Sequence, residues 1–373
     1  MSIRNTHRRV VWLTLALLLG LLWPAATSQA SENPHAGAVY ALTNATAANG
    51  GNAVIAFHRA GDGALTPAGT FPTGGAGTGS GLGSQGALAL AEGGRLLFAV
   101  NAGSDDVSVL RAGADGLRLV DRVRSGGSRP ISLTLHGRNL YVLNAGGSGN
   151  ITGFVVSEHG RLSPLAGSTR TLGGDATDPA QVSFSPDGGR LVVTEKATRT
   201  IASYTIGRDG LASGPLLRPS VGAVPFGFDF GRHGTLVVSE ASGGVSSYAP
   251  AAGGGYTVVS GAVPTHQVAA CWLVVTDSGR YAYTANAGSG SISGFRIDHG
   301  GALSPLNADG ITGVTGPGSH PIDLSFSHGS RYLYAVVNAS GGVAGFAVGP
   351  DGGLRGLGTF SGVPASAAGL VAT

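Results

Sequence analysis

The stretch RYAYTANAGSGSISGFRI, residues 280–297, decides the fold. It contains an apolar segment, a tight turn rich in Asn, Gly and Ser, and a second apolar segment that ends near an aromatic residue. Six further copies, three close and three looser, begin at Leu96, Leu140, Tyr332, Val39, Leu191 and Leu236. Two short strands joined by a turn, repeated through most of the chain, indicate a repeat architecture.

The copies align on the polar residue that ends the first strand. These residues are Asn44, Asn101, Asn144, Glu195, Glu240, Asn286 and Asn338. They are 57, 43, 51, 45, 46 and 52 residues apart, which is the period of a β-propeller blade. Seven copies therefore predict an all-β protein with seven blades.

Between these hairpins lies a second repeated set, which completes each blade. GRLSPL at Gly160 and GALSPL at Gly301 are typical of a turn and an outer strand. QVSFSPDGGR at Gln181 and IDLSFSHGSR at Ile322 are typical of an inner strand and its turn. Each blade thus has four strands. Since the repeats begin at a second-strand position, residues 367–373 are expected to supply the missing inner strand and close the ring.

The first thirty residues have the pattern of a secretory signal peptide. Arg4, Arg8 and Arg9 precede an apolar run over residues 10–23, and Ser28–Gln29–Ala30 forms an A-x-A-like cleavage site. A membrane anchor is the alternative. Fourteen helical residues span only about 21 Å, however, which is short of the roughly 30 Å hydrocarbon core of a bilayer. The paired arginines hint at twin-arginine export. We expect cleavage near Ala30, a single domain over residues 31–373, and a secreted or periplasmic location.

Charge and cysteine content limit the partners. The chain has 23 Lys and Arg against 20 Asp and Glu, and three arginines lie in the leader, which leaves 20 of each. No basic run remains that would hold nucleic acid or an anionic membrane surface. Cys271 is the one cysteine, so no internal disulfide forms. We expect a monomer that binds a small molecule.

Connectivity predicts which residues share the mouth of the central channel. Inner strands begin, and second strands end, on the same face of the ring, and a concave mouth is the usual place for a ligand. The candidates there are Gln181, Glu195, Lys196, Phe226, Glu240, Cys271, Trp272, Asn286, His320 and Asn338. The asparagines also suit the turn itself, because Asn bonds local backbone and tolerates positive φ.

Glu195 and Glu240 differ from the asparagines of the other five repeats. Glu is a poor turn residue and a poor strand former, so a role as a channel carboxylate is at least as well supported as that of a solvated surface group. Lys196, the only lysine, follows Glu195 directly. It is either a surface residue or a partner of Glu240 or of an anionic ligand.

The repeated sequences resemble the lactonase family of seven-bladed propellers, which includes propeller-type 6-phosphogluconolactonases and carboxymuconate cyclases. The resemblance covers about residues 37–373 and implies opening or closing of a lactone ring at the channel mouth. It also implies catalytic groups in four segments. The glutamate of one segment matches at Glu240. The histidines and arginine of the others are replaced by Gln181, Phe226 and Ala287.

Two functions follow from these observations. The first is an exported lactonase-type hydrolase with Glu240 as general base and with Glu195 or Lys196 tuning it. The predicted substrate-binding residues are Gln181, Phe226, Trp272, Asn286 and His320. The second is a non-catalytic propeller that binds a ligand or a protein. No cofactor is expected, although the carboxylate and amide oxygens are of the kind that Ca²⁺ prefers.

Overall fold

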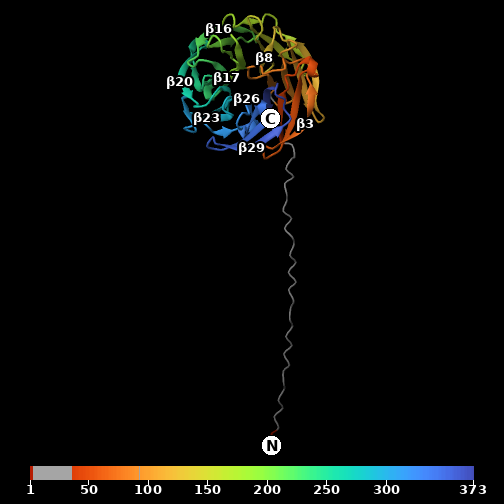
Figure 1. Cartoon of the computed structure of the whole chain (residues 1–373), viewed down its shortest axis with the longest axis vertical. Coiled ribbons are helices and arrows are strands. Elements are labelled where there is room, and N and C mark those ends of the chain that lie inside the picture. Colours follow the sequence, from red (N-terminus) through yellow and green to blue (C-terminus); the bar gives the residue numbers. More distant parts are fainter. Residues whose placement is uncertain (3–35, 92) are drawn as a thin grey trace. The chain divides into compact units, whose positions relative to one another are not determined.

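The computed structural model describes residues 1–2, 36–91 and 93–373. Residues from 36 onward form seven antiparallel sheets in a ring, with β8, β17 and β26 near its centre and β3, β16, β20 and β29 at its periphery (Figure 1). The predicted seven-bladed β-propeller is confirmed. Apart from its first two residues, the predicted leader lies outside the described residues. The helices of the described part are short 3₁₀ turns, none of them long or apolar enough to cross a bilayer.

We name the sheets blades A to G in chain order. Blade A contains β1 (Gly37–Leu42), β2 (Ala53–Arg59), β3 (Leu65–Pro72) and β30 (Ala368–Ala372). Blade B contains β4 (Leu88–Leu90), β5 (Leu96–Asn101), β6 (Asp106–Gly113) and β7 (Gly116–Arg124). Blade C contains β8 (Pro130–His136), β9 (Asn139–Asn144), β10 (Asn150–Val156), β11 (Leu162–Pro164) and β12 (Arg170–Thr171).

In the other four blades the strands run from inner to outer in chain order. Blade D contains β13 (Pro179–Phe184), β14 (Arg190–Glu195), β15 (Thr200–Ile206) and β16 (Ala212–Pro219). Blade E contains β17 (Pro225–Phe230), β18 (Leu236–Glu240), β19 (Gly244–Pro250) and β20 (Tyr256–Pro264). Blade F contains β21 (Ala270–Val275), β22 (Tyr281–Asn286), β23 (Ser291–Ile297), β24 (Leu303–Pro305) and β25 (Gly313–Val314). Blade G contains β26 (Pro321–Phe326), β27 (Tyr332–Val337), β28 (Gly342–Val348) and β29 (Leu354–Ser361).

The five 3₁₀ turns lie in connections between strands. They are η1 (Ala47–Asn49), η2 (Arg232–Gly234), η3 (Ala252–Gly254), η4 (His328–Ser330) and η5 (Asn338–Ser340). In blades C and F the outer position is divided between two short strands, because β11 and β12 both pair with β10, and β24 and β25 both pair with β23. Each blade therefore keeps four strand positions, as predicted.

The C-terminal strand closes the ring, as the sequence indicates. β30 pairs with β1 in antiparallel register, and the amide of Ala38 donates to the hydroxyl of Thr373 at 2.8 Å. The guanidinium of Arg59 donates to the Thr373 carbonyl at 3.0 Å. Residues separated by 335 positions thus complete one sheet, which removes two open edges.

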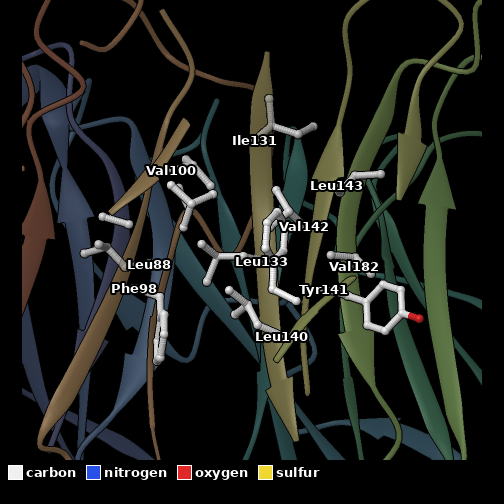
Figure 2. Packing of buried hydrophobic residues seen from close by; sticks show 14 of the residues in the cluster. Leu88, Phe98, Val100, Ile131, Leu133, Leu140, Tyr141, Val142, Leu143 and Val182 are labelled. Atoms are coloured by element: carbon white, nitrogen blue, oxygen red, sulfur yellow. The ribbon is translucent and has the colours of Figure 1, made fainter. Parts of the chain in front are cut away.

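The core lies between neighbouring blades. β5, β22 and β27 are buried at every residue, because a second strand packs on a blade at each of its faces. Figure 2 shows part of this core in blades B, C and D, where Phe98 of blade B lies on one side of Leu133 of blade C and Val182 of blade D lies on the other. Tyrosines add directional contacts: the hydroxyl of Tyr141 donates to the carbonyl of a turn glycine in the next blade, Gly210, at 2.8 Å. The equivalent pairs, Tyr283–Gly352 and Tyr334–Gly63, repeat this contact, the last across the closure.

The inner strands share an irregularity that shapes the channel. Pairing with the second strand shifts register near the start of β8, β13, β17, β21 and β26. Such a bulge leaves one residue unpaired and redirects its side chain. The unpaired positions are Ile131, Ala180, Phe226 with Gly227, Cys271 and Asp323.

Candidate functional site

A loop of this chain crosses the ring at the starts of the inner strands. We call residues 79–86 the channel loop. The hydroxyl of Ser84 donates to the carbonyl of Ile131 in blade C at 2.9 Å, and the amide of Gln85 donates to Ala180 in blade D at 3.1 Å. The Gln85 side chain reaches Leu273 in blade F, donating through Nε2 at 2.7 Å and accepting at Oε1 from the Leu273 amide at 2.9 Å. Contacts to three blades, two of them far apart in the ring, place this loop across the channel.

Gln85 takes the place of a side chain that blade E lacks. In blade D, Gln181 exchanges two hydrogen bonds with the backbone of Phe228 in the next blade, at 3.0 and 2.7 Å. The corresponding residue of blade E is Gly227, and a Cβ there would overlap Oε1 of Gln85. Gln85 therefore forms, from a distant loop, the inter-blade pair that Gln181 forms from its own strand.

Lys196 lies where blade D meets the channel loop. Its ammonium donates to the carbonyl of Gly83 at 2.7 Å, pairs with the Asp178 carboxylate at 3.3 Å, and lies 5.1 Å from the centroid of the Phe226 ring. The Lys196 side chain is 13% exposed and that of Asp178 is 65% exposed. Burial lowers the pKa of Lys196, and the charge of Asp178 opposes that effect.

Two predicted ligand residues lie beside Lys196. The rings of Phe226 and Trp272 meet edge to face, with centroids 4.9 Å apart. The indole Nε1 of Trp272 donates to the Ser84 carbonyl at 2.8 Å, so this aromatic pair lies under the channel loop. Cys271 is buried next to them, and burial raises the pKa of its thiol to about 12, which keeps it unreactive near neutral pH.

Glu240 is buried inside blade E. Its Oε1 accepts hydrogen bonds from the hydroxyls of Ser220 at 2.6 Å and Ser246 at 2.8 Å, while Oε2 has no partner among the described atoms. Gly222, in the loop that leads into β17, covers the carboxyl so closely that a Cβ would overlap it. Burial raises the pKa of Glu240, and the two serine hydroxyls oppose this. The carboxyl of Glu240 therefore holds the loop that contains Ser220 and Gly222 against blade E.

Glu195 has the same position in blade D. Its Oε1 accepts from the amide of Gly173 at 2.7 Å and its Oε2 accepts from the hydroxyl of Thr198 at 2.8 Å. The residue is fully buried, and burial raises the pKa of its carboxyl. Each glutamate is therefore bonded to groups of its own blade and of the loop that leads into it.

Asn286 shows that the strand-end position has a common structural use. Its amide donates to the hydroxyls of Ser291 at 3.0 Å and Ser293 at 2.9 Å, at the start of the next strand. Asn101 repeats this pattern with Asp106 and Ser108. All the strand-end residues except Asn338 are fully buried.

His320 lies apart from Lys196, in the loop before β26. It is exposed, and its Nδ1 lies 3.2 Å from Oδ1 of Asn338. Of the predicted site residues, the structure thus brings together Lys196, Phe226 and Trp272. Gln181 is near this group, because the carbonyl of its neighbour Ala180 accepts a hydrogen bond from the amide of Gln85 in the channel loop. The contacts of Glu195, Glu240, Asn286 and His320 described above are with other residues.

Asp323 is a buried acid outside the set of candidates expected from the sequence. It occupies the bulge of β26 with φ 42°, and no described donor meets its Oδ2. Burial raises its pKa to about 7, opposed by the nearby amides of Leu324, Gly86, Leu370 and Gly369. Asp229 of β17 bridges to the amide of Val275 at 2.8 Å, and burial raises its pKa to about 6. Among the described residues, no group of three or more His, Cys, Asp or Glu is arranged to hold a metal ion.

Asp178 and the channel loop are also absent from the sequence-based candidates. A local signal does exist for the loop: residues 73–87 separate β3 from β4, whereas only residues 125–129 separate β7 from β8. A long connection without regular structure is frequently functional. Asp178 has no such signal, because its partner Lys196 becomes its neighbour only when β13 pairs with β14.

Comparisons with known proteins agree with this architecture. The sequence profile described as "Lactonase, 7-bladed beta-propeller" matches residues 50–174 and 237–328, more than half of the chain. No curated protein matches. Among solved structures, a putative 6-phosphogluconolactonase from Bacteroides fragilis NCTC 9343 is similar with a TM-score of 0.72 and 18% identity, over 92% of this chain and 99% of that one.

Two further structures are similar at the level of the fold. The periplasmic gluconolactonase of Pseudomonas aeruginosa gives a TM-score of 0.70 at 20% identity, over 90% of this chain and 99% of the other. A protein from Lactobacillus plantarum gives 0.73 at 15% identity, with the same coverage. At such identities the structural likeness establishes the fold alone. The profile match, together with the seven closed blades, shows that the chain belongs to the lactonase family of seven-bladed β-propellers.

Proposed function

We propose that the protein hydrolyses a lactone at the channel mouth, around Lys196 and Asp178. The observation that carries the proposal is their 3.3 Å ion pair, in which a largely buried ammonium lies over an aromatic ring and an exposed carboxylate adjoins it. Family membership supports the reaction class, and two of the similar structures are named for sugar lactones. A sugar lactone is therefore the first substrate class to test.

The two side chains suit the two halves of ester hydrolysis. Asp178 accepts a proton from water as the water oxygen bonds to the lactone carbonyl carbon. Lys196 and the neighbouring cation Arg129 stabilise the negative charge that develops on the carbonyl oxygen. When the ring C–O bond breaks, the alkoxide takes the proton back from Asp178, and the product is a hydroxy acid.

Glu240 is the alternative base for the same reaction. Burial raises the pKa of Glu240, a shift that is frequent among catalytic bases, and Glu195 or Lys196 would then tune it. For Glu240 to reach a substrate, the loop that carries Ser220 and Gly222 has to move away from the carboxyl. Gln181 and Asn286 would polarise the carbonyl in that arrangement, with Phe226, Trp272 and His320 as binding residues.

A binding scaffold without catalysis is the second candidate function. The channel loop favours it, because Ser84 and Gln85 occupy polar groups of three inner strands that would otherwise face a substrate. Export belongs to both proposals and rests on the predicted leader. A small-molecule ligand and a monomeric state are likewise proposed for both.

A lactone panel with a pH-indicator readout tests the proposal. Asp178→Asn and Lys196→Met should each lower turnover about 100-fold or more, and Asp178→Asn, at an exposed side chain, should leave the melting temperature unchanged. Asp175→Asn is the matched control, since Asp175 is an exposed acid of the same loop. If Glu240→Gln abolished turnover and Asp178→Asn did not, the general base would be Glu240. A panel that is silent with folded protein would favour the scaffold, and repeats with EDTA and with Ca²⁺ would reveal a metal requirement.

A further inference from the structure

A groove rich in arginine lies between blades E and F, on the face of the ring where the inner strands turn into the second strands. Its volume is about 410 Å³, and it is lined by Arg232, Gly279, Arg280, Arg296, Ile297, Asp298 and His299. The channel loop is at the other end of the inner strands, so this groove is separate from the site around Lys196. We propose that it binds a tetrahedral oxyanion, the phosphate or sulfate group of a small molecule.

Two of the guanidiniums converge on one aromatic ring. The Cζ of Arg280 lies 5.6 Å, and that of Arg296 lies 5.3 Å, from the centroid of the Tyr281 ring. Tyr281 is itself fixed, because its hydroxyl donates to the carbonyl of Pro350 at 3.1 Å. The ring therefore orients two cations whose remaining donors are free to bind an anion.

The third guanidinium comes from the neighbouring blade. Nε of Arg232, in η2, donates to the Ser278 carbonyl at 2.6 Å. Its side chain packs on Gly279, where a Cβ would lie 2.6 Å from Cγ of Arg232. The absence of a side chain at residue 279 thus allows Arg232 to lie along the turn, with its terminal nitrogens still available.

These three cations lack an anionic partner within the described part of the chain. None of them forms a salt bridge there, and neither Arg280 nor Arg296 donates a side-chain hydrogen bond to a described atom. Asp298 lines the groove, but its Oδ1 accepts from the amides of Gly300 and Ala302, each at 2.8 Å. Like charges that line one groove repel one another, and a bound dianion reduces that repulsion.

The size and chemistry of the groove select the ligand. Arginine presents a planar fork of donors that matches phosphate and sulfate oxygens, and three such forks exceed what one carboxylate can accept. The volume falls within the range of small-molecule sites, so the groove can hold a phosphate together with part of the molecule that carries it. His299 also lines the groove.

Calorimetric titration of the full-length protein at constant ionic strength tests this inference. The probes are inorganic phosphate, sulfate and glucose 6-phosphate, which separate a free-anion site from a site for a phosphate monoester. Arg296→Gln and Arg280→Gln should each weaken binding about tenfold or more. Arg118→Gln, an exposed arginine of β7, is the control for net charge and should leave binding unchanged.

Two results would overturn the inference. The first is the absence of binding at millimolar concentrations of all three probes. The second is binding that weakens equally in Arg118→Gln and Arg296→Gln, because net charge alone would then explain it. Melting curves of each variant establish that the protein titrated is folded, and lactone turnover should be the same in Arg296→Gln as in the wild type.

Discussion

Gln85 and Leu273 are joined by two hydrogen bonds across 188 residues of sequence. The side-chain amide donates to the Leu273 carbonyl and its oxygen accepts from the Leu273 amide, so one side chain satisfies both polar groups of a buried residue in β21. A loop that is irregular along its length is thereby fixed to the innermost strand of a distant blade. The relationship makes the channel loop part of the structural core of the ring.

Gln85→Met should destabilise the protein while keeping a similar side-chain volume. The N–H and C=O groups of Leu273 lose their partners in a buried place, which should lower the free energy of unfolding by about 2 kcal/mol or more. Urea denaturation followed by tryptophan fluorescence measures this directly. Gln267→Ala, at a half-buried position, is the control and should have the smaller effect. Equal effects of the two substitutions would show that the hydrogen bonds of Gln85 contribute no more to the free energy of unfolding than those of a half-buried glutamine.

The adjacent glycines 173 and 174 provide a matched test of how Glu195 is enclosed. A Cβ on Gly173 would lie 2.7 Å from Oε2 of Glu195 and 2.9 Å from Leu217, whereas a Cβ on Gly174 would meet no atom within 4 Å. Gly173→Ala should therefore cost about 1–3 kcal/mol, and Gly174→Ala should be nearly neutral. Thermal melts of the two variants decide the matter, and a stable Gly173→Ala would mean that the Glu195 side chain can leave its place freely.

Stability should fall as pH rises toward neutrality. Burial raises the pKa of Asp323 to about 7 and that of Asp229 to about 6, from an ordinary value of 3.8. Because these carboxyls hold their protons more tightly when folded, they stabilise the folded state fully below pH 3.8 and lose that effect as pH rises through 6 and 7. The raised pKa values of Glu195 and Glu240 act in the same direction.

Melting temperatures from about pH 4 to about pH 8 test this dependence. The wild type should lose stability across that interval, and Asp323→Asn should lose less. Asp229→Asn is an independent second variant, which keeps the prediction testable if the first folds poorly. Parallel curves for all three proteins would show that neither carboxyl changes its protonation on unfolding in this range.

Removal of residues 369–373 should destabilise the ring strongly. The deletion takes away most of β30, including the buried Leu370, and with it the contacts of Thr373 to Ala38 and Arg59. The lost apolar burial and hydrogen bonds should together cost roughly 3–5 kcal/mol. Differential scanning calorimetry measures the change, and an unchanged melting temperature would contradict closure through β30.

Much of this architecture is legible in the sequence, because a propeller blade is a local unit. The aligned residues from Asn44 to Asn338 define seven hairpins, and the missing inner strand at the start indicates closure by the last residues. Burial of Glu195 and Glu240 is harder to predict, since it depends on Gly173 and Gly222 in loops that arrive from the preceding blade. A carboxylate that is covered by a loop and one that faces a channel have the same sequence signature.

The channel mouth shows why candidate sites are less predictable than folds. Lys196, Phe226 and Trp272 lie close together, and strand direction is enough to place all three on one face of the ring. Asp178 and Gln85 depend on side-chain geometry and on contacts between residues far apart in the chain. Periodicity contains no information about either.

The anchoring of Gln85 to β21 also constrains the order in which the protein can fold. Blade B follows the channel loop directly, but the contacts of that loop require strands that emerge from the ribosome almost 190 residues later. Blade A can be completed only later, because its inner strand β30 includes contacts between residues 335 positions apart. Refolding should therefore be slow and all-or-none, unlike the stepwise growth of open repeat arrays, and a nascent chain can reach its native state only when its last strand is free.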